Sequence, residues 1–430
     1  MMLDVLEEHL SEAAFLWAQR ERASVASNYT LDEVAELEAR LLAHLDGLVT
    51  AGPPAIAFLA PKVQEGEDPG EAFAATWALL VLAPSLVLDA VKTRAIDAPS
   101  AVQFAMTRAL ELGEAAVVEP ALVPWLNMAE PIPLSLALNA LGGRGRISVD
   151  RALQLLRHPE GAVVAAALRA LKPSPKLQAP KELSRLLSDS RPEVRWAAIM
   201  AGLLFGTRDA WVACEQEATT AQGAQRRTSW ALLAAAGDAL FLDRLVASAE
   251  SEAFREDALW ALGFSGRIPA AESCMRWMAG KPRVARLAGE VFSAITGLRL
   301  EGAYVLAEPE PEDALPPLEE ESLDADLSLR AEDGLPLPAA GEIGRWWATE
   351  QKAFQVDARY LEGRLFTGSA LLDALEHGPM RRRQMHALEL MLRTRGACTV
   401  QVQAFSERQR EELARASAVR ERLPSWGLGR

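Results

Sequence analysis

The stretch from Asp189 to Gly206, DSRPEVRWAAIMAGLLFG, combines a turn with one amphipathic helix. Asp189 is a residue type that caps helix starts, and Pro192 suits the first helical turn because an N–H there has no intrahelical partner. Small and aliphatic residues then recur at three- and four-residue steps, which predicts one apolar face: Val194, Ala197, Ala198, Ala201 and Leu204. Gly206 stands where helices end in a left-handed conformation. We expect a helix whose alanines let a neighbouring helix approach closely.

Copies of this helix follow one another along most of the chain. Ala201 belongs to a series of eight alanines separated by 31, 31, 30, 31, 30, 30 and 33 residues, and in the other seven copies the alanine is followed by a large aliphatic residue. A period near thirty accommodates two helices and two turns, a unit that buries its apolar face only against its neighbours. The other seven steps are Ala78-Leu79, Ala109-Leu110, Ala140-Leu141, Ala170-Leu171, Ala231-Leu232, Ala261-Leu262 and Ala294-Ile295.

Val194-Arg195 followed by Ala197-Ala198 resembles the second-helix signature of HEAT-type repeats. We therefore predict an all-α protein built around an α-solenoid of HEAT-like helical repeats. Half of the residues are apolar and few are aromatic, which suits helices packed on helices. The expected domains are an N-terminal two-helix cap at 1–54, about eight repeats at 55–300, an acidic proline-rich arm at 301–340 and a small helical region at 341–430.

The net charge of −14 is concentrated in the predicted arm. Residues 301–340 contain twelve acids and one base, a net −11, which leaves −3 for the rest of the chain. A solenoid so close to neutral lacks the long basic stripe that duplex binding requires, so we expect no nucleic-acid partner.

Cysteine usage and the N-terminus indicate a cytoplasmic protein. Cys214, Cys274 and Cys398 are odd in number and far apart, which is typical of reduced packing residues. The first ten residues carry acids where an export signal would carry bases. The most apolar run, 72–88, is interrupted by polar residues and a proline, and its repeat register explains it better than a membrane span does.

The two ends of the chain resemble a known family. Their sequences are similar to those of an uncharacterised proteobacterial HEAT-repeat family that is often encoded near type VI secretion genes. The resemblance implies an accessory, adaptor or chaperone-like role and supplies no catalytic residues. It rests on Glu12–Trp17, Arg20, Ala43–Leu48, Ala51-Gly52, Trp346-Trp347, Arg359–Gly363 and Gln384–Leu390.

The predicted N-terminal cap contains a short motif formed by Trp17, His44 and Asp46. His44 and Asp46 are two residues apart and therefore lie on different faces of a helix, which predicts a structural hydrogen bond and not acid–base catalysis. Upstream, Thr30 and Glu33 have the spacing of a capping box.

No metal or cofactor site is expected. The five histidines show no ligand spacing, and no Cys-x-x-Cys pair exists. The glycine-rich stretch 142–146 lacks the Lys-Ser/Thr ending of a phosphate loop and follows a predicted helix, so it indicates a turn between repeats.

A candidate interface lies in the C-terminal region. The arginines could pair with the chain's own acidic arm or lie on a solvated face, or they could meet an acidic protein partner or nucleic acid. One of the adjacent tryptophans could anchor a partner, because tryptophan is enriched in binding hot spots. The candidate residues are Trp346, Trp347, Arg359, Tyr360, Arg364, Arg381, Arg382 and Arg383.

The function expected from these features is non-catalytic protein–protein interaction, with the chain acting as a scaffold or adaptor linked to type VI secretion. A solenoid offers a long surface with distributed contacts and needs no chemical site. The expected partner is a protein, such as a secretion component or effector. Three alternatives remain: a HEAT-like enzyme of the bilin lyase type, a HEAT-type nucleic-acid-binding protein and a self-assembling structural protein.

Overall fold

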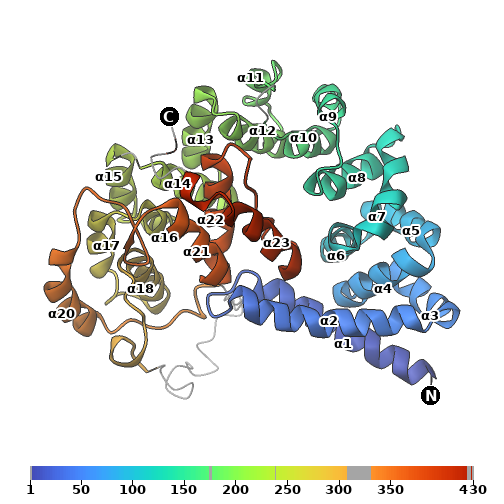
Figure 1. The fold of residues 1–430 in the computed structure, drawn as a ribbon, viewed down its shortest axis with the longest axis horizontal. Helices are drawn as coiled ribbons and strands as arrows, with labels where there is room; N and C mark the ends of the chain where they lie inside the picture. Colours follow the sequence, from blue (N-terminus) through green and yellow to red (C-terminus); the bar gives the residue numbers. More distant parts are fainter. Residues whose placement is uncertain (1, 174–176, 238, 308–330, 424–427, 429–430) are drawn as a thin grey trace, which may run out of the picture. The chain divides into compact units, whose positions relative to one another are not determined.

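The computed structural model describes residues 2–173, 177–237, 239–307, 331–423 and 428 (Figure 1). These residues form twenty-two α-helices and one short hairpin, which confirms the predicted all-α class. The chain divides into two compact units. Unit 1 contains residues 1–24, 29–213 and 394–416, and unit 2 contains 25–28, 214–393 and 417–430. The division differs from the boundaries expected from sequence, because a piece of the predicted C-terminal region belongs to unit 1.

Unit 1 consists of consecutive helix pairs. The second helices of successive pairs pack on one another, so that α4, α6, α8, α10 and α12 form a row. The elements are α1 (Met2–Ala23), α2 (Leu31–Thr50), α3 (Pro53–Gln64), α4 (Pro69–Leu82), α5 (Pro84–Asp97), α6 (Ser100–Leu112), α7 (Ala115–Leu122), the 3-10 helix η1 (Val123–Asn127), α8 (Pro131–Gly143), α9 (Val149–Leu155), α10 (Gly161–Ala170), α11 (Leu183–Leu186), α12 (Pro192–Leu204), the first part of α13 (Arg208–Thr220) and nearly all of α23 (Ser406–Ser417).

Unit 2 repeats the pairing and then departs from it. Helices α14, α16 and α18 form its row. The elements are α14 (Gly223–Ala236), α15 (Ala239–Ser248), α16 (Arg255–Ser265), α17 (Ile268–Met275), α18 (Pro282–Thr296), η2 (Gly302–Tyr304), α20 (Ala340–Glu350), η3 (Gln351–Ala353), β1 (Tyr360–Leu361), β2 (Arg364–Leu365), α21 (Gly368–His377), α22 (Met380–Arg393) and η4 (Arg420–Arg422).

The thirty-residue period of the sequence matches the spacing of the helices that form the two rows. Each alanine of the series lies in, or at the end of, one of α4, α6, α8, α10, α12, α14, α16 and α18. Ala78, Ala109 and Ala231 are completely buried, as are the leucines that follow them. An alanine at this position lets the backbones of neighbouring row helices approach closely, while the adjacent leucine fills the space between pairs. The thirty-residue repeat therefore reflects how successive helix pairs pack on one another.

Helix α12 begins and ends as expected, but its N-cap residue differs from the predicted one. Gly206 has φ +69, the left-handed conformation predicted for it. Pro192 is the first helical residue, also as predicted, but the cap is Arg191 and not Asp189. The Asp189 carboxylate instead accepts from the backbone N–H and guanidinium of Arg191, at 3.0 and 2.9 Å. The side-chain hydrogen bond from Arg191 lowers the pKa of Asp189 to about 2.

Helix α2 begins with the predicted capping box. The Thr30 hydroxyl accepts from the backbone N–H of Glu33 at 3.4 Å, and the Glu33 carboxylate accepts from the backbone N–H of Thr30 at 2.7 Å. Helix α2 packs along α1, and both contact α4.

The segment around Tyr360 is a hairpin, whereas a helical pattern was expected from 341 onward. Tyr360 pairs with Leu365, and Leu361 pairs with Arg364. The two turn residues, Glu362 and Gly363, have φ +51 and +77. Two positive φ angles in succession fit a two-residue hairpin turn and cannot continue a helix.

Most of the predicted acidic arm lies outside the described residues, which stop at 307 and resume at 331. Its two described ends meet on unit 2. The Leu306 N–H donates to Leu337 O at 2.8 Å, and the Ala339 N–H donates to Tyr304 O at 2.9 Å. The described segments that end at 307 and begin at 331 therefore lie side by side.

Membrane-spanning character is weak among the described helices. No single helix in the described part of the chain is both long and apolar enough to cross a bilayer. Helices α2 and α3 reach the required length and composition only together, and the chain bends by 115° between them.

Candidate functional site

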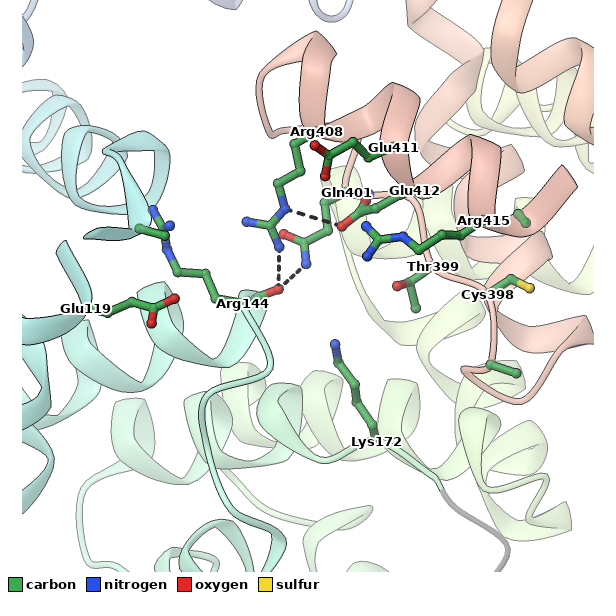
Figure 2. Close-up of a pocket in the computed structure, with 14 residues that line it drawn as sticks. Glu119, Arg144, Lys172, Cys398, Thr399, Gln401, Arg408, Glu411, Glu412 and Arg415 are labelled. Carbon is green, nitrogen blue, oxygen red and sulfur yellow. Dashed lines mark hydrogen bonds and ion pairs between the residues drawn. The ribbon is translucent and has the colours of Figure 1, made fainter. Parts of the chain in front are cut away.

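A pocket of about 530 Å³ lies within unit 1 (Figure 2). One wall comes from α7 and the C-terminal end of α8, a second from Lys172, which lies two residues beyond α10, and a third from the segment 397–416 with α23. We call it the charged pocket. Its lining residues are Ala115, Glu119, Gly143, Arg144, Lys172, Ala397, Cys398, Thr399, Gln401, Arg408, Glu411, Glu412, Arg415 and Ala416.

The end of α8 holds the C-terminal segment through one backbone carbonyl. Gly143 O accepts from Gln401 Nε2 and, at 2.8 Å, from Arg408 Nη2. The last carbonyls of a helix have no intrahelical partner, so these side chains satisfy a group that would otherwise be unpaired. Glu412 fixes both donors, because its carboxylate accepts from Gln401 N at 2.6 Å and from Arg408 Nε at 3.3 Å.

A buried arginine on α1 anchors the same segment from the other side. The Arg20 side chain donates to Glu38 Oε1 at 3.0 Å and to the carbonyl of Gln403 at 3.1 Å. Arg108 donates to the same Gln403 carbonyl at 2.7 Å. Glu38 Oε2 in turn accepts from the Ser406 N–H, at 2.7 Å, where α23 begins. The N-terminal helices thus set the position of α23, and with it one wall of the charged pocket.

The described lining of the pocket carries four cationic and three carboxylate side chains. Two of these carboxylates already form ion pairs: Glu412 pairs with Arg408, and Glu119 pairs with Arg146 at 2.9 Å. Among the described residues, neither Lys172 nor Arg415 has a hydrogen-bond or ion-pair partner, and both are exposed. Figure 2 shows them extending into the pocket from different walls.

The cations in the pocket repel one another. Burial lowers the pKa of Arg144, and the neighbouring charge of Arg408 lowers it further. The Arg144 guanidinium is held by backbone carbonyls, including Glu111 O at 3.0 Å, and not by a carboxylate. An anion in the pocket would offset this repulsion and provide a partner for Lys172 and Arg415.

The pocket lining includes one thiol, that of Cys398. Cys398 is half-buried, and burial raises its pKa, so its thiol stays protonated at neutral pH and is a weak nucleophile. None of the described lining residues is a histidine that could act as its base. Within the described part of the chain, no group of three or more His, Cys, Asp and Glu side chains is arranged to hold a metal ion.

The three consecutive arginines predicted as an interface are buried in unit 2. Arg381 pairs with Glu290 at 3.1 Å and with Glu332 at 2.7 Å, and Arg382 donates to Gly263 O at 2.9 Å. Arg383 is fully buried. Of the alternatives, pairing with the acidic arm therefore holds for Arg381, because Glu332 belongs to that arm. A solvated face and direct contact with a partner are both wrong for this cluster.

Glu332 is held strongly by two arginines of unit 2. Burial alone raises the pKa of Glu332, but the positive charges of Arg381 and Arg227 outweigh it and lower the pKa to about 2. Arg227 lies 2.7 Å from the carboxylate.

The remaining C-terminal candidates divide between core and surface. Trp347 is buried against Phe292, with ring centroids 5.5 Å apart, and Tyr360 is buried as well. Trp346 and Arg359 are half-buried. Arg364 is exposed and pairs with Asp373 at 2.8 Å. Of the predicted interface residues, Trp346 and Arg364 remain candidates for a surface contact in this unit.

The predicted cap motif does not converge on one point. Trp17 stacks on Phe73 with ring centroids 4.9 Å apart. His44 Nδ1 lies 3.2 Å from His9 Nδ1, and Asp46 is exposed. The motif residues therefore serve separate local contacts in unit 1.

Sequence reasoning missed the charged pocket. The turn at 142–146 was recognised, with Gly145 at φ +72, but its contribution is a carbonyl acceptor and not a phosphate cradle. Lys172 and Arg415 lie more than two hundred residues apart in the sequence. No local pattern links them, because only the return of residues 397–416 into unit 1 brings them to one pocket.

One buried histidine makes unit 2 sensitive to acid. Burial and the charge of Arg382 lower the pKa of His386 to about 3 from its usual 6.5, with Arg359 and Arg383 adding to the shift and Glu389 opposing it. Because the folded pKa lies below the unfolded one, His386 contributes fully above pH 6.5, and this contribution is lost as the pH falls toward 3.

Lowering the pH from 7.5 to 5 is expected to cost about 2 kcal/mol through His386 alone, at about 1.4 kcal/mol per pH unit below 6.5. His386→Leu should remove this dependence. Urea unfolding at the two pH values measures it, and an unchanged difference between the two conditions in the variant would contradict the assignment.

Comparisons with known proteins do not identify a function. No protein-family model matches the sequence, and no curated protein is similar to it. Among solved structures, the chain is similar to human deoxyhypusine hydroxylase, determined in complex with glycerol. The sequence identity is 16%, the match covers 67% of this chain and 97% of that one, and the TM-score is 0.24. The fold class rests on the helix pairs themselves: the chain is an all-α protein of consecutive helix pairs.

Proposed function

We propose that the protein is a non-catalytic interaction scaffold whose charged pocket binds an acidic group of a partner protein. The observation that carries this proposal is the presence of two cations, Lys172 and Arg415, that line one pocket and have no described acidic partner. Thr399 adds a hydroxyl and Gln401 an amide at the same place. A carboxylate seated there would accept charge-assisted hydrogen bonds from both cations.

The charge of the whole chain makes such a pocket useful for specificity. A net charge of −14 repels an acidic partner at long range. An acidic segment of the partner would therefore bind at the local cationic pocket and not elsewhere on the surface. Charges at an interface generally contribute more to the choice of partner and to binding register than to affinity.

The partner that fits the sequence resemblance is a component or effector of type VI secretion, in the cytoplasm. Arg20 belongs to the motif that carries this resemblance, and it anchors the segment that forms one wall of the charged pocket. In this proposal the motif supports partner binding indirectly, by positioning α23. The role is that of an accessory adaptor.

The proposal is tested by comparing two charge-matched double variants of the full chain. Lys172→Glu with Arg415→Glu reverses the two pocket cations. Arg40→Glu with Lys352→Glu reverses two exposed cations elsewhere and changes the net charge by the same amount. Each variant and the unmodified chain are used to capture proteins from the native host, and captured proteins are quantified by mass spectrometry.

We expect the unmodified chain and the control variant to capture at least one discrete protein in similar amounts. The captured amount of that protein should be at least tenfold lower with the pocket variant. Equal capture by both variants would overturn the pocket as the binding site. Co-purification of a chromophore or nucleic acid in place of a protein, visible in the absorbance spectrum, would overturn the scaffold proposal.

A further inference from the structure

The charged pocket continues into two further hollows of unit 1. A hollow of about 550 Å³ shares Ala115 and Glu119 with it. A groove of about 680 Å³ shares Ala116, Pro120 and Pro124 with that hollow. The three therefore form one continuous surface around α7 and η1, with Lys172 and Arg415, the two lining cations that have no described acidic partner, at one end.

The far end of this surface is mainly apolar. We call it the apolar groove, and its walls come from α4, α5, α7 and η1. Val81 in the apolar groove is 45% exposed, and Val123 in the connecting hollow is 48% exposed. Large aliphatic side chains this exposed, lying together along one surface, are typical of interaction sites. The apolar groove is lined by Leu80, Val81, Pro84, Ser85, Leu88, Asp89, Lys92, Ala116, Val117, Pro120, Ala121, Pro124, Trp125 and Met128.

Two prolines stiffen the middle of this surface, and the first of them leaves one backbone carbonyl of α7 without its usual helical donor. Pro120 stands inside α7 and has no N–H, so it donates no hydrogen bond to Ala116 O, its usual helical partner. Pro124 lies in the first turn of η1. Proline rings lose little conformational entropy on binding, and this favours contact with an extended peptide.

We infer that the partner docks as an extended segment with apolar side chains in the apolar groove and an acidic residue in the charged pocket. This inference rests on the proposed function and adds the form of the ligand to it. Two observations select this occupant: the continuity of the three hollows, and charge complementarity at Lys172 and Arg415.

The width of α7 sets a minimum spacing within the segment. A helix with its side chains is about 10–12 Å across. An extended chain advances about 3.3 Å per residue, so crossing α7 takes at least three to four residues. The binding motif therefore has apolar residues separated by at least three positions from its acidic residue.

The test is a selection from a random dodecapeptide phage library on the full-length protein. A fluorescein-labelled synthetic peptide with the selected consensus is then titrated by anisotropy. It is titrated against the unmodified chain, against Lys172→Glu with Arg415→Glu, and against Val81→Asp with Val123→Asp. The matched control for the valines is Val5→Asp with Val212→Asp, two equally exposed positions in unit 1 outside the three hollows.

The expected consensus contains apolar residues and an acid at the stated spacing. Binding of the consensus peptide should weaken at least tenfold with each of the first two double variants and stay within twofold for the control. Added salt should weaken binding to the unmodified chain and have little effect on the Lys172/Arg415 variant.

The outcomes separate this inference from the proposed function. A purely acidic consensus that depends on Lys172 and Arg415, but not on Val81 and Val123, overturns the extended two-part ligand and leaves the proposed function intact. A consensus independent of Lys172 and Arg415 overturns both. Absence of any enriched sequence overturns the extended-peptide inference, and host capture then decides the proposed function separately.

Discussion

Replacing Glu389 by glutamine is expected to lower the free energy of unfolding of unit 2 by about 3–5 kcal/mol, the cost of breaking a buried ion pair by removing one partner. The Glu389 carboxylate is buried and accepts from Arg359 Nη2 at 3.0 Å and from Arg393 Nε at 2.8 Å. Without it, the guanidinium groups of Arg359 and Arg393 are left partly or fully removed from water without their counter-charge.

The electrostatics at Glu389 explain why this effect is large. Burial alone raises the pKa of Glu389, but the charges and hydrogen bonds of Arg359 and Arg393 outweigh it and lower the pKa to about 2. The carboxylate therefore stays charged at neutral pH. Arg359 also donates to Phe264 O at 2.9 Å, so the same pair connects the hairpin segment, α16 and α22.

Urea unfolding at pH 7 followed by circular dichroism measures the loss. The matched control is Glu252→Gln, which removes the partner of Lys281 from an exposed ion pair of 2.9 Å and should leave the unfolding midpoint unchanged. Similar midpoints for the two variants would contradict the role assigned to Glu389.

The second large effect is expected from Arg20→Met, which removes the charge that holds the C-terminal segment in unit 1. The substitution keeps an apolar stem of similar length but leaves Glu38 buried without its guanidinium partner, and it frees the Gln403 carbonyl from one of its two donors. We expect a loss of about 3 kcal/mol in unit 1, at the lower end for a broken buried pair, because Glu38 keeps its hydrogen bond from Ser406 N.

A double-mutant cycle separates pairing from packing. Arg20→Met with Glu38→Gln removes both charges, and we expect it to be less destabilising than the sum of the two single variants. Hydrogen exchange provides a local measurement, since amides at 403–406 should lose protection in Arg20→Met while those of α10 keep theirs. Additive single effects, or uniform loss of protection across unit 1, would contradict a specific anchor.

Much of the fold could be predicted from local sequence because its determinants are local. Pro192 and Gly206 follow from which backbone groups lack partners at helix ends. Thr30 and Glu33 satisfy each other within four residues. The alanine steps recur because each row helix meets a neighbour of the same kind. The hairpin at 360–365 was missed because its two positive φ angles are held by unit 2 around it, as Gly363 N donates to Ile295 O at 3.0 Å.

The sites depend on contacts that local sequence does not encode. A run such as 381–383 has the same letters whether its guanidiniums face water or Glu290 and Glu332, and burial decides between these environments. Lys172 and Arg415 each look like an ordinary surface charge, and only the return of residues 397–416 into unit 1 turns them into one pocket.

By itself, the sequence determined the all-α class, the thirty-residue period and the ends of several helices, because the energies that select these features act between residues a few positions apart. Only the tertiary structure decided which charges are buried and which converge, because those choices depend on pairs separated by tens to hundreds of residues.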